Sequence, residues 1–328
     1  MPITHVEPAD RAGFLALVNA EIRPDRAKTN AMDDFPVILG PRNSPWQLVY
    51  KTAEGRIAGC IAALIRTVST SSGDIAVAGV GSVVTAPDFR GKGLSRELQN
   101  ALLDRLRGKN IPLAVLWTDQ PEIYAGRGFT AAGWEIHLSL ADWQLSNLPE
   151  TSLRIEEFTP ADVPAVESLF CRHPWRTLRE PGDSLAYYTM PGTRGLVARD
   201  PSGQIQAYAF CGKGGDFPDY VCEWGGSHEA LLPVLARVRR RDMAHQILIP
   251  AGAENLVNPL VDQGCGWVAL PSGQWAVLDA ALLEEYLEPG GKNPTRMIHP
   301  QEWLGTIGND GQPVPGALNV AIWGFDSV

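Results

Sequence analysis

The sequence predicts an α/β fold, in which helices flank a mixed sheet, and it predicts two copies of this fold along the chain. At 328 residues the chain is long for one hydrophobic core, so two domains are the default expectation. Apolar runs typical of strands alternate with stretches of helical periodicity from residue 3 to residue 140. Short segments of this first part recur, in the same order, in the second half.

The predicted elements of the first half follow one another as βααβββαβαβ. The first strand covers residues 3–6, and Pro8-Ala9-Asp10 opens a helix that continues to residue 22. A second helix is predicted around residues 28–39, before Gly40-Pro41. The later elements are strands over 46–50, 56–68 and 75–85, a helix over 94–106, a strand over 112–117, a short helix near Tyr124 and a strand over 131–140.

The polar stretch 145–152 breaks the periodicity, so we place the domain boundary there. We expect an N-terminal domain over residues 1–146, a diverged second copy over 152–280 and a C-terminal tail over 281–328. Three segments of the second half are similar to segments of the first half and support the second copy. Thr159-Pro160-Ala161-Asp162 is similar to Glu7-Pro8-Ala9-Asp10, and Gly203-Gln204-Ile205 is similar to Gly55-Arg56-Ile57. The third pair is Gly264-Cys265-Gly266-Trp267 and Gly126-Arg127-Gly128-Phe129. The tail becomes apolar between Leu318 and Phe325, and we expect it to dock on the body.

A glycine-bearing loop joins the strand that ends at Thr85 to the helix that begins near Leu94. Its sequence is Ala86-Pro-Asp-Phe-Arg-Gly-Lys-Gly93. The first turn of a helix has backbone N–H groups without intrahelical partners, and the helix dipole favours negative charge there. Glycines leave that backbone open, and Arg90 and Lys92 add positive charge. The stretch therefore predicts a phosphate-binding site. Gly79 and Gly81 in the preceding strand predict a bulge or a close backbone approach.

This loop resembles the acyl-CoA pyrophosphate loop of the Gcn5-related N-acetyltransferases, whose pattern is Arg/Gln-x-x-Gly-x-Gly/Ala. Arg90, Gly93 and Ser95 occupy its defining places, although Ser95 replaces the usual Gly or Ala by another small residue. The segment from Tyr124 to Phe129 is similar to the Tyr-x-x-x-Gly-Phe segment of the family. Together with a degenerate second copy, these motifs look like the tandem acetyltransferases, among them the enhanced intracellular survival aminoglycoside acetyltransferases and mycothiol synthase.

The resemblance implies an N-acetyltransferase that takes its acetyl group from acetyl-CoA. It implies that the backbone of Val83, Val84 and Thr85 holds the pantetheine arm and polarises the thioester. The pyrophosphate is expected on the loop residues Arg90, Gly91, Lys92, Gly93, Leu94 and Ser95. Tyr124 is expected to be the general acid that protonates the CoA sulfur; the alternative is an aromatic ring packed under the short helix.

The general base is open at this stage. Asp119 and Glu122 precede Tyr124 and face the expected acceptor channel, but Asp119-x-x-Glu122 around Pro121 is also a capping pattern, which we favour. In the enhanced intracellular survival enzymes the terminal carboxylate takes part in the active site, which makes Val328 a further candidate. Too few residues follow residue 280, however, for the third, sterol-carrier-like domain of those enzymes. A base is unnecessary if enough acceptor amine is neutral, and water could relay the proton.

The second copy is expected to hold no cofactor. Trp224-Gly-Gly-Ser-His-Glu229 stands where a basic, glycine-spaced turn would be needed, and Asp262 stands where the tyrosine would be. An acidic residue near a helix start opposes the binding of a phosphate. We therefore expect one working site, in the first copy.

Composition and charge limit the classes of binding partner that we expect for this chain. The net charge of −9 and the absence of a long Lys/Arg run argue against nucleic acid or an anionic membrane. Six scattered histidines lack metal-ligand spacing, and the odd count of five cysteines without a Cys-x-x-Cys pair favours a reduced, cytoplasmic chain. The leading hypothesis is acetylation of a small-molecule amine. Acylation of a protein or peptide amine and non-catalytic binding of acyl-CoA remain as alternatives.

Overall fold

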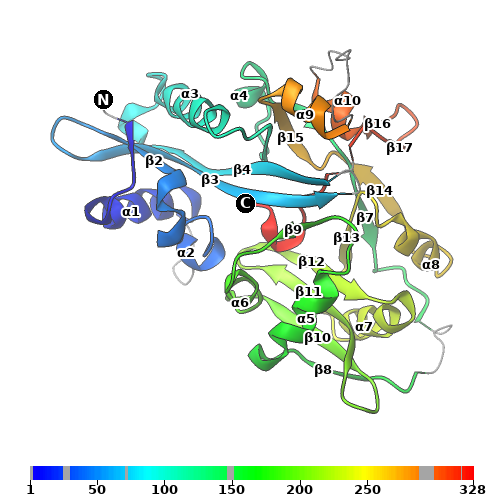
Figure 1. Ribbon diagram of the computed structural model, residues 1–328. Coiled ribbons are helices and arrows are strands. Elements are labelled where there is room, and N and C mark those ends of the chain that lie inside the picture. Colours follow the sequence, from blue (N-terminus) through cyan, green and yellow to red (C-terminus); the bar gives the residue numbers. More distant parts are fainter. Residues whose placement is uncertain (1–2, 25–29, 71–72, 146–150, 288–298, 319) are drawn as a thin grey trace.

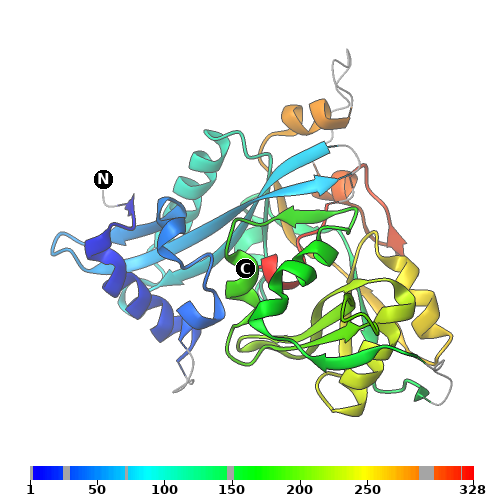
Figure 2. The same ribbon diagram turned by 60° about the horizontal axis from the view of Figure 1, so that its bottom comes forward.

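The computed structural model describes residues 3–24, 30–70, 73–145, 151–287, 299–318 and 320–328. These residues form two large sheets side by side, with the C-terminal end of the chain between them (Figures 1 and 2). A small two-stranded sheet, β16 (Thr306–Ile307) with β17 (Pro313–Val314), lies in the C-terminal region. No helix in the described ranges is long and apolar enough to cross a membrane.

The first sheet has the order β1-β2-β3-β4-β5-β15-β6. Its members are β1 (Ile3–His5), β2 (Gln47–Lys51), β3 (Ile57–Thr70), β4 (Gly73–Thr85), β5 (Leu113–Leu116), β15 (Gly273–Val277) and β6 (Thr130–Ala132), and β9 (Arg176–Leu178) also pairs with β3. The β4–β5 pair is parallel and the others are antiparallel. The helices of this half are α1 (Arg11–Ile22), α2 (Ala31–Asp34), α3 (Leu94–Arg107) and α4 (Glu122–Ala125).

The second sheet repeats this order as β8-β10-β11-β12-β13-β7-β14, again with one parallel pair, β12–β13. Its strands are β8 (Arg154–Glu157), β10 (Arg194–Arg199), β11 (Ile205–Lys213), β12 (Asp216–Gly226), β13 (Gln246–Pro250), β7 (Glu135–Ser139) and β14 (Trp267–Leu270). Its helices are α5 (Val163–Phe170), α6 (Asp183–Tyr188), α7 (His228–Arg240) and α8 (Val257–Val261). The shared order confirms the tandem fold.

One strand is exchanged between the two sheets. The predicted single strand over 131–140 is wrong: it is split into β6, in the first sheet, and β7, in the second. Gly133 lies between them with φ +63°, a left-handed conformation that breaks a strand. In return, β15 from the second half, labelled in Figure 1, pairs with β5 on one side and β6 on the other. Alternation of apolar residues indicates a strand but does not say which sheet the strand joins.

Both faces of the first sheet are covered, which explains the almost continuous apolar sequence of β3. Helix α3 packs on one face through Leu94, Leu98, Leu102 and Leu106, which share one side of the helix as the spacing predicts. Helices α1 and α2 cover the other face. The second helix is shorter than predicted, because only α2 is helical between residue 30 and Gly40, where Pro36 interrupts the segment; residues 25–29 lie outside the described residues.

The tail includes α9 (Ala280–Leu287) and α10 (Pro300–Leu304) and then runs between the two halves. Leu318, Val320 and Ile322 are buried with Trp275 of the first sheet, whereas Ala321, Trp323 and Phe325 are buried in the core of the second half. Alternate side chains of one extended segment therefore enter the two cores.

Candidate active site

The two parallel strands of the first sheet separate at the site. β4 and β5 pair only over Val77–Gly79 and Leu113–Val115. Beyond that point β4 carries a bulge, where Ser82 has φ +52° and the register with β3 shifts between Cys60 and Ala62. The divergence leaves the β5-facing edge of β4 without a strand partner from Gly81 onward in the described residues. Such an edge can pair with an extended, amide-bearing ligand.

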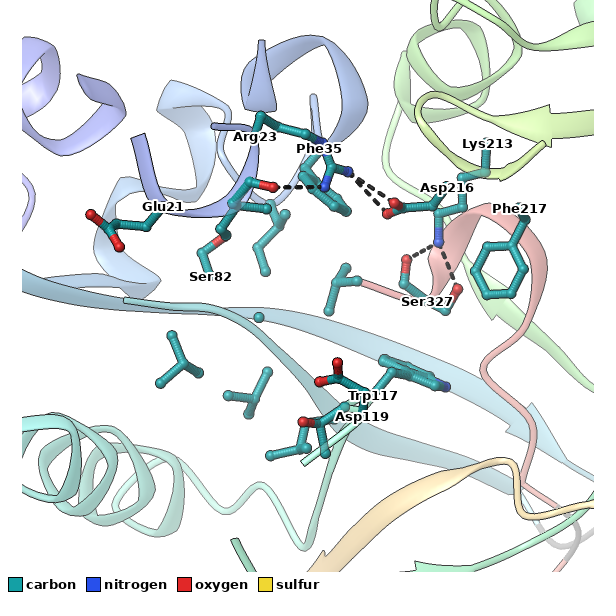
Figure 3. Close-up of a pocket in the computed structure, with 18 of the residues that line it drawn as sticks. Glu21, Arg23, Phe35, Ser82, Trp117, Asp119, Lys213, Asp216, Phe217 and Ser327 are labelled. Atoms are coloured by element: carbon teal, nitrogen blue, oxygen red, sulfur yellow. Dashed lines mark hydrogen bonds and ion pairs between the residues drawn. The ribbon is translucent and has the colours of Figure 1, made fainter. Parts of the chain in front are cut away.

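A cavity of about 650 Å³ opens over this divergence (Figure 3). Both halves and the tail line it. The first half contributes Glu21, Ile22, Arg23, Phe35, Ile38, Val80, Gly81, Ser82, Val83, Leu116, Trp117, Thr118, Asp119 and Tyr124; the second half contributes Lys213, Asp216 and Phe217; the tail contributes Ser327 and Val328.

Tyr124 lies on α4 and faces the cavity. Its ring packs edge-on against Phe129, with centroids 6.2 Å apart, and within the described residues its hydroxyl has no hydrogen-bond partner. Burial raises the pKa of Tyr124; Asp119 adds to this effect and Arg127 opposes it. The hydroxyl therefore stays protonated at neutral pH, as a proton donor must. Tyr124 packs under the helix and also lines the cavity, so the two expectations for it are compatible.

The capping role that we favoured for Asp119 and Glu122 is wrong. Helix α4 begins after Pro121 without a side-chain cap, and Thr118 Oγ1, rather than Asp119, accepts the Gln120 amide at 3.0 Å. The backbone turns through a Thr-based turn, and among the described residues the Asp119 side chain has no hydrogen-bond partner. Asp119 is exposed and lines the cavity, whereas Glu122 is exposed at the start of α4 and does not line it.

The loop before α3 is open to solvent. Gly91 and Gly93 have φ +74° and +84°, and Gly93 is the N-cap of α3. In the described residues the amides of Gly91 to Ser95 have no hydrogen-bond acceptor. Arg90 pairs with Glu21 and donates from Nε to the Thr85 carbonyl at 3.3 Å. These free amides at the start of a helix are the anion-binding geometry that the sequence predicts.

The other predicted residues of this region are placed as follows. Val83 lines the cavity, Val84 is buried, and Thr85 is half-buried with its Oγ1 unpartnered in the described part of the chain. Lys92 lies 4.8 Å from the centre of the Phe89 ring. Leu94 is buried in the core under α3, and the Ser95 hydroxyl accepts from Gln99 Nε2 at 3.1 Å. The Lys92 and Ser95 side chains thus have local partners, while the backbone beside them stays open.

Val328 lies against β4. A Cβ added at Gly79 would come within 2.8 Å of Val328 Cγ2, and one at Gly81 within 3.4 Å of the Val328 carbonyl carbon. The expected close approach at these glycines is therefore present, and the group that approaches is the chain's own tail.

Three residues of the second half, Lys213, Asp216 and Phe217, were missed by the sequence reasoning. They lie at the β11–β12 hairpin, which reaches into the first half. There Arg23 pairs with Asp34 at 2.5 Å and with Asp216 at 3.1 Å, and the Gly215 amide donates to Asp34 at 3.0 Å. The Gly214-Gly215 turn was the available sequence signal, but it indicates a hairpin and not where the hairpin docks.

In the second half, the corresponding turn between β12 and α7 has no open loop that could bind an anion, as far as the described residues show. β12 runs almost directly into α7, and the hydroxyl of Ser227, the N-cap of α7, accepts the Ala230 amide at 3.3 Å. This side chain satisfies a donor that a phosphate would need. The expectation that the second copy holds no cofactor stays a prediction.

Comparisons with known proteins agree with this geometry. Residues 39–132 match the family model described as an acetyltransferase (GNAT) domain. A probable N-acyltransferase of Enterococcus faecalis is similar in structure, with a TM-score of 0.69 and 12% identity over 87% of this chain and 74% of that chain. Eis1 from Mycobacterium abscessus is also similar in structure, with a TM-score of 0.60 and 14% identity over 88% of this chain and 75% of that chain.

N-myristoyltransferase from Saccharomyces cerevisiae, solved with bound myristoyl-CoA, gives a TM-score of 0.54 and 10% identity over 98% of this chain and 89% of that chain. At these identities the likeness establishes a shared fold. No curated protein matches the sequence.

Proposed function

We propose that this chain, a member of the Gcn5-related N-acetyltransferase (GNAT) superfamily and an acyltransferase, transfers the acetyl group of acetyl-CoA to the amine of a small molecule. One observation carries the proposal: an edge of β4, a protonated tyrosine and an exposed carboxylate face the same cavity, formed where β4 and β5 separate. A thioester, an amine and a proton donor must meet within such a space.

Acetyl-CoA would bind along β4 and the loop before α3. Its pyrophosphate would take hydrogen bonds from the free amides between Gly91 and Ser95, and Arg90 would leave Glu21 to pair with it. Its pantetheine amides would pair with the open edge of β4 near Val83, as a strand added to a sheet does. This arrangement directs the thioester towards Tyr124.

The chemistry is a direct transfer. The neutral amine attacks the thioester carbon, and the carbon–sulfur bond breaks as the carbon–nitrogen bond forms. Tyr124 gives its hydroxyl proton to the departing sulfur, and the acceptor nitrogen loses a proton to a base or to water. The bulge at Ser82 would direct a backbone amide towards the oxyanion that forms in between.

Two carboxylates are candidates for the base. Asp119 is exposed in the cavity close enough to Tyr124 to affect its pKa. The α-carboxylate of Val328 is the other candidate, because Val328 lies against β4 in the same cavity. Two variants, Asp119→Asn and a chain that lacks Val328, show which of these candidates is the base. We expect the variant that loses the base to have a kcat about 100-fold lower, with the largest loss at low pH. The intact mass of the purified protein verifies that Val328 carries the free carboxylate.

The cavity suits a small cationic acceptor. Its volume is within the range of small-molecule sites. Arg23 pairs with Asp34 and Asp216, and Arg90 would leave Glu21 on binding the cofactor, so the carboxylates of Asp119 and Glu21 give the described lining negative charge. The aromatic side chains Phe35, Trp117 and Phe217 add surfaces on which a cation can lie.

The deciding experiment is thiol release from acetyl-CoA across polyamines, aminoglycosides, amino acids and peptides. We expect turnover with at least one small amine, and we expect Tyr124→Phe to lower kcat by about 100-fold without changing the Kd for CoA. The matched control is Tyr50→Phe, a half-buried tyrosine of the same half that does not line the cavity. Tight CoA binding without turnover on any amine would refute the proposal.

A further inference from the structure

The last residues of the chain are held in place by a lysine of the second half. Lys213 Nζ donates to Ser327 Oγ at 2.6 Å and to the Ser327 carbonyl (Figure 3), and it also donates to the Gly324 carbonyl at 3.1 Å. These acceptors use all three donors of the ammonium group. Lys213 is only 5% exposed. A cation buried this deeply persists only where it is well paired, so these contacts are specific.

Asp326, one residue before Ser327, is held by a second set of charges. Its carboxylate accepts from Thr177 Oγ1 at 2.5 Å and from Arg179 Nη2 and Nε at 2.7 and 2.9 Å. Arg66 Nε lies 3.3 Å from its other oxygen. Arg66 comes from β3 of the first half, whereas Thr177 and Arg179 come from the second half. Three distant segments of the chain thus meet at one buried carboxylate.

The partners of Asp326 are themselves fixed. Arg179 also pairs with Glu223 of β12, whose carboxylate accepts from the Tyr188 hydroxyl at 2.8 Å and from the Tyr208 hydroxyl at 3.2 Å. Arg66 pairs with Asp183 at 2.8 Å. The direction in which the tail enters the cavity is therefore set by a network that lies outside the cavity.

We propose that Lys213 and Arg179 are positioning residues of the acyl-transfer site, which fix Ser327 and Val328 as a wall of the acceptor part of the cavity. This inference rests on the proposed function. The inference assigns a task to the second copy. The second copy controls acceptor binding and the transfer step, while the first copy alone binds acetyl-CoA. The division follows from the geometry, because the loop from Gly91 to Ser95 makes no contact with this network among the described interactions.

The test compares Lys213→Met with a matched control. Methionine keeps the length of the lysine stem, tolerates burial and removes all three hydrogen bonds to the tail. The control is Asp162→Asn, which removes a buried charge that pairs with Arg199 in the same half, away from the tail. We expect Lys213→Met to lower kcat/KM for the amine by about ten-fold and to change the KM for acetyl-CoA by less than about two-fold. Asp162→Asn should leave both parameters unchanged.

Hydrogen exchange of the 320–328 peptide supplies a readout that does not need turnover. We expect its amides to exchange about ten-fold faster in Lys213→Met and at the wild-type rate in Asp162→Asn. If the wild-type protein acetylates no amine, the proposed function fails, and this exchange still decides whether Lys213 holds the tail. Unchanged exchange, equal losses in both variants, or an acetyl-CoA KM that rises together with the amine KM would overturn the inference.

Discussion

Burial raises the pKa of two acidic groups of this protein, but their neighbours give them opposite charge states. At Tyr124 burial dominates, so the pKa rises and the hydroxyl keeps its proton. At Asp326 burial alone would raise the pKa, but Arg179 and Arg66 outweigh it and hold the pKa below its usual value. A protonated hydroxyl and a fixed negative charge thus result from the same loss of water, and the neighbouring guanidinium groups decide between them.

Asp326→Asn should therefore change how stability depends on pH. Because the pKa of Asp326 is lower in the folded chain, its stabilisation is fully present above the unfolded value of about 3.9 and is lost as pH falls through the folded value. At pH 7 we expect the variant to be about 3 kcal/mol less stable, since Arg179 and Arg66 keep other partners. Below pH 4 the difference should shrink.

Urea unfolding between pH 3 and pH 7 measures this difference. Asp104→Asn is the control, because Asp104 is 76% exposed in its pair with Arg107. This substitution should shift the urea midpoint of unfolding little at any pH. Parallel curves for wild type and Asp326→Asn would contradict the prediction.

Local chemistry accounts for the site residues that the sequence could predict. A helix start that carries glycines predicts the phosphate site from Arg90 to Ser95, and the family resemblance implies the proton-donor role of Tyr124; both stay predictions. Lys213 and Asp326 could not be predicted, since their roles arise from contacts between segments more than 100 residues apart. The helix cap expected from Asp119 does not form for a local reason, because α4 begins only after Pro121 and Thr118 Oγ1 accepts the nearby Gln120 amide.

At the scale of an element, the start of α3 depends on backbone conformation rather than on side chains. Gly93 has φ +84°, and a Cβ there would meet nothing within 4 Å. Only the left-handed conformation, not crowding, therefore opposes a larger residue. The free amides that follow it depend on this conformation.

Gly93→Ala should lower the free energy of unfolding by about 1 kcal/mol and raise the Kd for CoA by about ten-fold. Gly126→Ala is the control, because Gly126 is equally open but has φ −71°, which alanine adopts freely. Calorimetric titration with CoA and urea unfolding measure both quantities. Equal CoA affinity in the two variants would show that the amides of this turn do not bind the pyrophosphate.

Most elements of the first half were predictable, because each is a local pattern. The apolar run of β4 and the leucine face of α3 are where the sequence places them. The exchange of β7 and β15 was not predictable, since a strand's pattern records that its faces are buried and not which neighbours bury them. For the same reason, the sequence does not show that the β11–β12 hairpin contributes to the site.

At the scale of the whole molecule, the exchanged strands make each sheet incomplete without the other half. β15 fills the place between β5 and β6, and its Trp275 is only 1% exposed. β7 fills the place between β13 and β14. Ion pairs from Arg23 to Asp216 and from Arg66 to Asp183 also join the halves. Separation would expose unpaired strand edges on both sides of each gap.

We therefore expect the halves not to fold when they are separated at the boundary that the sequence predicts. Fragment 1–146 lacks β15 and fragment 151–328 lacks β7, so each alone should aggregate or remain unfolded, whereas co-expression should restore a soluble complex that binds CoA. The intact chain should unfold in one calorimetric transition, because neither sheet can persist after the other is lost. Two separate transitions, or a soluble 1–146 fragment with the CoA affinity of the whole chain, would mean that the exchanged strands contribute little to either core.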